Sequence, residues 1–123
     1  MNEQNTRILF DRYPRLYRGR FMPLDKSLMQ WGFTCGDGWF DLVDRLSTAI
    51  EAECQRLRET EGWDEAGLPI ATQVKEKFGT LRFRMRPTTS VIQSLVENAF
   101  AESEKICEHC GQLKVEGCSC DLL

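Results

Sequence analysis

The spacing of apolar residues predicts two amphipathic helices, over residues 37–61 and 90–106. In the first, Asp37 is a suitable N-cap, and apolar side chains recur every three or four positions: Phe40, Val43, Leu46, Ile50, Cys54 and Leu57. In the second, Ser90 and Gln93 have capping-box spacing, and the apolar stripe comprises Ile92, Leu95, Val96, Ala99, Phe100, Ser103 and Ile106. Each stripe needs another element to cover it.

Residues 70–86 show the two-residue alternation of a β-hairpin, with a tight turn centred on Phe78 and Gly79. This turn places Val74 opposite Phe83. The apolar face then carries Ile70, Thr72, Val74, Leu81, Phe83 and Met85. The opposite face carries Lys75, Lys77, Arg82, Arg84 and Arg86. A slip of one residue in the pairing buries part of this charge, so the pattern itself specifies the register.

A two-stranded hairpin is marginally stable alone, so its apolar face must pack on the two long helices. We therefore expect an α+β protein in which residues 1–123 form a single domain. Residues 1–36 are expected to be irregular, with short helices that include one over 6–13 and one that closes on Gly32. The remaining part, residues 107–120, is a tail with metal-binding chemistry.

Four of the six cysteines lie in the tail, in the segment "CEHCGQLKVEGCSC". Cys107 and Cys110 have the C-x-x-C spacing of a zinc knuckle, and Cys118 and Cys120 can complete a structural four-thiolate zinc site. His109 is an alternative ligand in place of one cysteine. A redox dithiol is the rival interpretation, but Cys107 follows a helix C-terminus, where the helix dipole opposes a thiolate. Clustered metal-binding cysteines favour a reducing compartment.

Charge and hydropathy narrow the classes of partner. The net charge is −3 and the pI is near 5.2, which argues against a general nucleic-acid binder. A local basic patch is still allowed, because residues 70–86 alone carry five cations and one acid. No run approaches the roughly 20 apolar residues of a membrane helix, so we expect a cytoplasmic protein without a membrane partner.

Candidates for catalysis are few. Asp37, Asp41 and Asp44 could form a magnesium site, but acidic residues at the start of a helix explain the same pattern. Cys35 and Cys54 are interpreted as small buried hydrophobic residues. The sequence has no phosphate loop, dinucleotide-binding glycine pattern or nucleophile elbow. We therefore expect a protein that is not an enzyme.

Three segments together resemble a known family: "WGFTCGDGW", "TQVKEKFGTLRF" and "SEKICEHCG". The chain is similar in these motifs to small proteins found in bacteria, phages and prophages. These share a glycine-tryptophan turn, a K-E-K-F-G-x-L-R-F-like hairpin and a C-x-x-C-G after a helix. The resemblance implies a zinc-bearing α+β domain and no established reaction.

Several hypotheses for function remain open. The first is a phage or prophage interaction protein that binds a host protein or complex, for example a defence system, and inhibits or modulates it. The second is a nucleic-acid-associated module that uses the basic hairpin face together with Arg12, Arg15, Arg18 and Arg20, with Tyr13 and Tyr17 stacking on bases. An enzyme built on the aspartates ranks last. The simplest interpretation of the basic face is a solvated surface that the acidic first helix neutralises.

Overall fold

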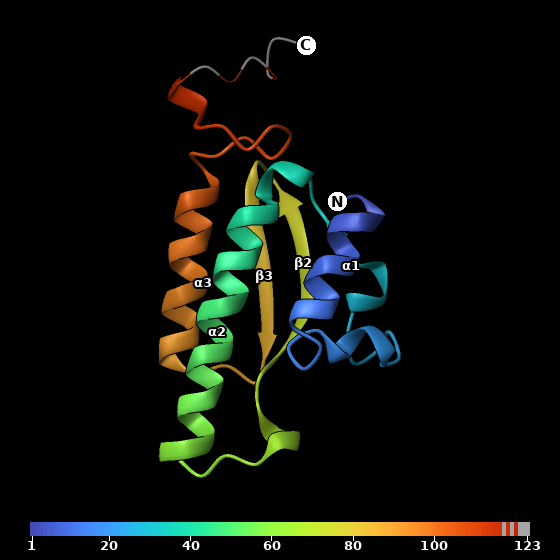
Figure 1. Ribbon diagram of the computed structural model, residues 1–123, viewed down its shortest axis with the longest axis vertical. Helices are drawn as coiled ribbons and strands as arrows, with labels where there is room; N and C mark the ends of the chain where they lie inside the picture. Colours follow the sequence, from blue (N-terminus) through green and yellow to red (C-terminus); the bar gives the residue numbers. More distant parts are fainter. Residues whose placement is uncertain (117, 119, 121–123) are drawn as a thin grey trace.

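Three α-helices and a three-stranded sheet make up the described part of the chain. The structure is a computed structural model, and it describes residues 1–116, 118 and 120. The elements, in chain order, are α1 (Glu3–Arg12), β1 (Phe33–Thr34), α2 (Phe40–Thr60), β2 (Ile70–Lys77), β3 (Thr80–Arg86) and α3 (Ser90–Ser103) (Figure 1). Short 3₁₀ turns connect them. The predicted α+β class is confirmed, with the cysteine tail at one end.

The hairpin has the register that its sequence predicts. Val74 pairs with Phe83, and the pairs nearer the turn follow in step, down to Lys77 with Thr80. Phe78 and Gly79 both have positive φ, 55° and 77°, as a two-residue type I′ turn requires. This turn matches the twist of the two strands, so it sets the pairing locally.

The N-terminal half of β2 departs from the predicted pairing, because a β-bulge lies between Ala71 and Gln73. The extra residue places Ala71 opposite Met85 and buries it fully, whereas Thr72 is only half-buried. The assignment of Thr72 to the apolar face was therefore wrong. The backbone at the bulge forms hydrogen bonds with the N-terminal segment. Ala71 N–H donates to the Leu16 carbonyl at 2.9 Å, and the Thr72 carbonyl accepts from Leu28 N–H at 2.7 Å.

Strand β1 is an addition within the segment expected to be irregular. It pairs in parallel with β2, so the sheet order is β1-β2-β3. Phe33 is buried beside Tyr17, with ring centroids 5.0 Å apart. Such a strand is hard to predict, since its partner lies some 40 positions along the chain and only two residues pair.

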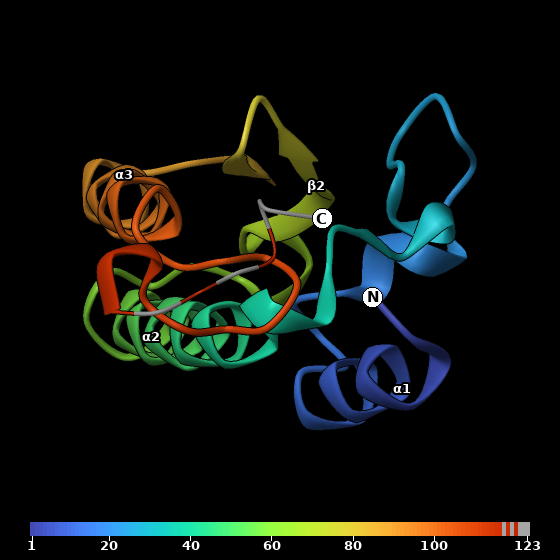
Figure 2. The same ribbon diagram turned by 90° about the horizontal axis from the view of Figure 1, so that it is seen from above.

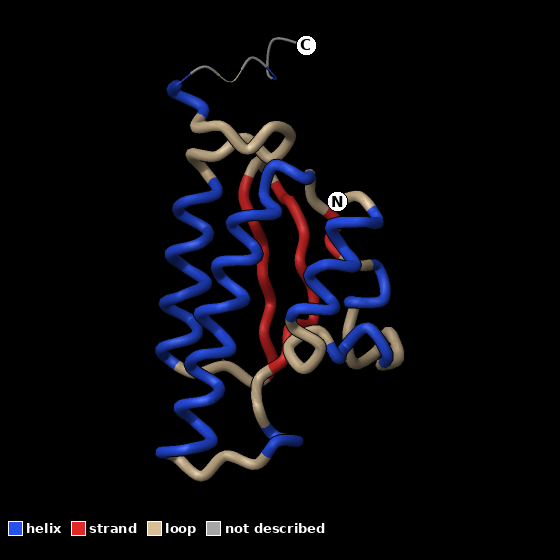
Figure 3. Tube along the Cα trace, in the orientation of Figure 1, coloured by secondary structure: helices blue, strands red, loops and turns tan. Residues whose placement is uncertain are grey.

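The inner face of the sheet is covered by helices. Figure 2 shows α1 and α2 on the same side of the sheet, with α3 beside α2, and in Figures 1 and 3 the strands β2 and β3 are seen between α2 and α1. Tyr13 links α1 to α2 by donating a hydrogen bond to Asp44 Oδ1 at 2.6 Å. The largest fully buried side chains belong to Trp39, Tyr17, Leu9, Leu16 and Met29. One hydrophobic core thus joins the N-terminal segment, the helices and the hairpin.

Both long helices differ from prediction at their ends. Asp37 does not cap α2: it opens a 3₁₀ turn, and its carboxylate accepts hydrogen bonds from Asn2 N–H and the Asn5 amide. Thr89, rather than Ser90, caps α3, because its hydroxyl accepts from Ile92 N–H. Helix α3 ends at Ser103 instead of residue 106, since the chain turns there into the cysteine tail.

Candidate metal centre

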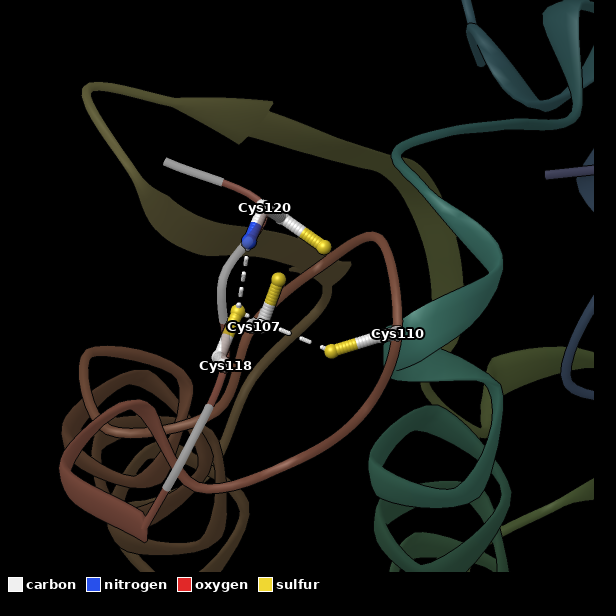
Figure 4. Close-up of side chains that lie close together, drawn as sticks. All are labelled: Cys107, Cys110, Cys118 and Cys120. Carbon is white, nitrogen blue, oxygen red and sulfur yellow. Dashed lines mark hydrogen bonds between the residues drawn. The ribbon is translucent and has the colours of Figure 1, made fainter. Parts of the chain in front are cut away.

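The four tail cysteines come together at the end of the molecule beyond α3. The sulfur atoms of Cys107, Cys110, Cys118 and Cys120 all lie within 4.8 Å of one another (Figure 4). The Cys110 and Cys118 sulfurs are 3.6 Å apart. In a tetrahedral zinc site with Zn–S bonds of about 2.3 Å, sulfurs lie about 3.8 Å apart. The cluster therefore matches a closed four-thiolate site, and it can hold a metal ion.

The electrostatics of the cluster favour a bound cation. The backbone N–H of Cys110 and the neighbouring N–H of His109, 3.4 Å from the sulfur, lower the pKa of Cys107 to about 6. Hydrogen bonding with the other thiols, Cys107 first, raises the pKa of Cys120 to about 12. One thiolate forms readily here, but each further one meets negative charge. A divalent cation removes that repulsion and allows all four to deprotonate.

Local backbone chemistry shapes the loop that carries the first pair of cysteines. Gly111 follows the second cysteine with a φ of 78°, and its N–H donates to the Cys107 carbonyl at 2.9 Å. The Cys107 N–H in turn donates to the Gln112 carbonyl at 2.9 Å. A left-handed residue is needed to close this turn, which is why glycine stands there. We call residues 107–111 the knuckle.

The knuckle docks on the glycine-tryptophan segment that precedes α2. Gly38 N–H donates to the Glu108 carbonyl at 2.6 Å, and Trp39 Nε1–H donates to the Ile106 carbonyl at 2.9 Å. A Cβ atom on Gly38 would lie 2.3 Å from the Cys107 carbonyl oxygen. Sequence reasoning missed this role, although the motif "CGDGW" carries its signal: two glycines spaced for close backbone approach, followed by a buried tryptophan.

His109, Cys35 and Cys54 all lie outside the four-cysteine cluster. His109 is exposed and lies outside the group of four sulfurs. All six cysteines are free thiols, and Cys35 and Cys54 are buried, as expected for small hydrophobic residues. Burial raises the pKa of Cys35 to about 12, which keeps this thiol protonated. Neither buried cysteine adds a ligand to the cluster.

The three aspartates near the start of α2 do not gather into a site. Asp41 pairs with Arg45 at 3.1 Å, and Asp44 pairs with Arg12 at 3.0 Å. Asp37 bonds to the N-terminal residues instead. Within residues 1–116, 118 and 120, the four cysteines are the one group suited to a metal ion.

The five hairpin cations lie on the face of the sheet opposite the core. We call Lys75, Lys77, Arg82, Arg84 and Arg86 the basic outer face. Arg84, Arg86 and Lys77 are exposed, while the Arg82 guanidinium lies over the Phe100 ring of α3 at 5.3 Å. Among the described residues, no carboxylate pairs with any of the five.

Helix α2 does not neutralise this face, contrary to the simplest interpretation of the sequence. Four of its five acids pair with other arginines: Glu51 with Arg15, Glu53 with Arg56, and the two aspartates as described. The fifth, Glu59, accepts a hydrogen bond from the Gln55 amide. The alternating charge blocks do meet in the fold. They meet on the helix side, away from the hairpin cations.

The N-terminal residues assigned to a nucleic-acid surface do not extend the basic outer face. Tyr17 is fully buried, its hydroxyl bonds to Ser47 Oγ at 2.6 Å, and burial raises its pKa. Arg18 donates to the backbone carbonyls of Glu65, Ala66 and Leu68, and Arg20 stacks on Phe10 and Phe21. Because Tyr17 is buried, it cannot stack on a base, and that part of the nucleic-acid hypothesis was wrong.

Comparison with known proteins identifies no relative. No family model matches the chain, and no curated protein or solved structure matches it. The resemblance to small phage and prophage proteins stays a prediction. In the described chain, no helix combines the length and the apolar character that crossing a membrane requires.

Proposed function

We propose that the four-cysteine cluster binds one zinc ion with a structural role. Zinc favours tetrahedral thiolate sites, and four sulfurs leave no open position for a substrate. Gly38 already bonds to the knuckle and the Trp39 indole bonds to the Ile106 carbonyl just before it, so the ion would fasten the tail to the start of α2. This arrangement supports stability rather than chemistry.

We further propose that the protein is a non-enzymatic interaction protein that docks through its basic outer face on an acidic surface of a protein partner. One observation carries this proposal: five cations share one sheet face without a paired carboxylate in the described chain, while four of the five acids of α2 pair with arginines elsewhere. Charge left unmatched within a chain is available to match a partner.

We propose a host protein or complex, such as a defence system that the chain inhibits or modulates, as this partner. The resemblance of the three sequence motifs to phage and prophage proteins supports this choice. A chain with a net charge of −3 needs a local basic patch to approach an acidic surface, and the basic outer face supplies one.

Capture from a lysate of the natural host tests the docking proposal. The test variant carries Arg84→Glu and Arg86→Glu, and the control carries Arg7→Glu and Lys105→Glu, two exposed cations elsewhere. Both variants change the net charge equally. We expect wild type and control to retain the same protein and the test variant to lose it. Equal retention by all three would contradict the proposal.

Nucleic acid is the second candidate partner. Phe78 is 86% exposed at the hairpin turn, next to Lys77, and could stack on a base. We expect weak binding or none, because the chain's acids repel the phosphate backbone. A gel-shift with mixed-sequence DNA or RNA decides the matter. Sub-micromolar binding near physiological salt, lost on reversing Arg82, Arg84 and Arg86, would promote this candidate.

A further inference from the structure

Strand β3 leaves part of its outer edge open. The two-residue turn makes Lys77 and Thr80 a hydrogen-bonded pair, so alternate residues of β3 direct their backbone groups away from β2: Leu81, Phe83 and Met85. Ser103 of α3 closes the first of these positions, since its Oγ accepts from Leu81 N–H at 2.9 Å. In the described chain, the N–H groups of Phe83 and Met85 have no partner.

A hollow lies against this open edge. It measures about 480 Å³ and is lined by residues 83–86 of β3, by Gln93, Val96 and Glu97 of α3, and also by Thr88 and by Thr72 of β2, so it extends from the edge over the end of the hairpin. Ligand pockets span roughly 300–1,000 Å³, so the hollow has room for a short segment of chain. Figure 2 shows α3 beside the hairpin. The hollow lies between the first turns of this helix and the C-terminal end of β3.

We propose that an extended acidic segment of a protein partner pairs with β3 at Phe83 and Met85. This inference rests on the proposed function of the basic outer face and names the form of its ligand. Open sheet edges bind extended peptides through their backbone groups, and alternate side chains give specificity. The bound segment becomes a fourth strand of the sheet. It is limited to the part of β3 that follows Leu81, because Ser103 closes the edge at Leu81.

The side chains on β3 define the sequence that fits. In an added antiparallel strand, residues opposite Phe83 and Met85 face the inner side, toward Val96 and the core. Residues between them face the basic outer face beside Arg84 and Arg86. The fitting segment therefore alternates apolar and acidic residues, because acidic side chains directly beside arginines are favourable cross-strand neighbours.

Two other occupants fit less well. A second copy of this chain, pairing β3 with β3, would bring Arg84 and Arg86 of both copies together, and like charges across a strand pair are unfavourable. Nucleic acid would satisfy the arginines but has no regular backbone pattern to match the N–H groups of Phe83 and Met85. An acidic polypeptide satisfies both features at once.

A labelled short peptide that alternates glutamate and valine is the probe, with fluorescence anisotropy at low salt as the measurement. Two matched peptides carry N-methyl groups either on the valine amides, which face β3, or on the glutamate amides, which face away. We expect valine methylation to weaken binding about tenfold or more, and glutamate methylation to change it less than about threefold. The variant with Arg84→Glu and Arg86→Glu should bind all three peptides weakly.

Other results separate this inference from the proposed function. If both methylated peptides bind like the parent and the charge-reversed variant binds none, edge pairing is overturned while docking on the basic outer face stands. If wild type binds no peptide, the inference is overturned and the lysate experiment alone judges the proposed function. Displacement of the peptide by oligothymidine, or a dimer of the chain that the peptide dissociates, would also overturn it by naming another occupant.

Discussion

The two faces of the β2–β3 hairpin use the same strands for different purposes. On the inner face, Val74 and Leu81 are almost completely buried in the hydrophobic core. On the outer face, Arg84 and Arg86 reach solvent without a paired acid among the described residues. The buried residues of the inner face determine the register and the fold. The exposed side chains of the outer face can change their contacts without disturbing either. Stability and recognition are therefore separable on this element.

The largest expected effect comes from placing a charge on the inner face. Val74→Asp should destabilise the protein by roughly 3 kcal/mol or more, because an unpaired carboxylate would enter the core. Arg84→Ala, on the opposite face, should cost less than about 0.5 kcal/mol. Urea unfolding of both variants measures the difference. If Val74→Asp does not fold, Val74→Ala replaces it, with an expected loss of about 1–3 kcal/mol.

Similar losses from the inner-face and outer-face changes would mean that the two faces are wrongly assigned. Phe83, the cross-strand partner of Val74, provides a second check on the same face.

The next effect extends the comparison to the knuckle, which packs near the turn end of the hairpin. Gly38→Ala should cost about 1–3 kcal/mol, because the new Cβ would clash with the Cys107 and Glu108 backbone, which cannot yield as a flexible side chain can. Gly67→Ala is the matched control, with nothing within 4 Å of its Cβ position, and should change stability by less than about 1 kcal/mol. Thermal unfolding of the metal-loaded proteins measures both. Equal melting temperatures would contradict the close docking of the knuckle.

The smallest effect concerns a carboxylate that has partners, in contrast to the outer-face cations. Hydrogen bonds from Asn2 N–H, and then from the Asn5 amide, lower the pKa of Asp37 below its ordinary value of 3.8. Its contribution to stability is therefore present above that value and is lost as the pH falls through the lower folded pKa. Asp37→Asn should be less stable than wild type at neutral pH, and the gap should shrink below about pH 4. A gap that is constant from pH 7 to about pH 3 would contradict this assignment.

Local patterns predicted much of the fold. The turn at Phe78 and Gly79 and the alternation around it were sufficient for the register, because both act between neighbouring residues. The bulge at Thr72 was not predictable in this way, since its backbone is bonded by Leu16 and Leu28 from a distant segment. Strand β1 was missed for the same reason.

The sequence predicted the candidate metal site more completely than the contacts that surround it. Four cysteines in fourteen positions suggested a thiolate cluster, and the structure brings their sulfurs together. The docking of the knuckle on Gly36 and Gly38 was hidden, because backbone contacts between segments some 70 positions apart leave only a pair of glycines as their trace. The same limit applied to the charges: only the folded chain shows which acids the arginines meet.

Zinc content tests the central claim most directly. Elemental analysis of protein purified without added metal should find about one zinc ion per chain. Closed thiolate sites bind zinc with an apparent free energy of roughly 10–16 kcal/mol at neutral pH. Chelation should then increase amide exchange first in residues 103–111, while the amides around Val74 stay protected by the core. A metal-free protein in which residues 103–111 are as protected as the core would contradict the claim.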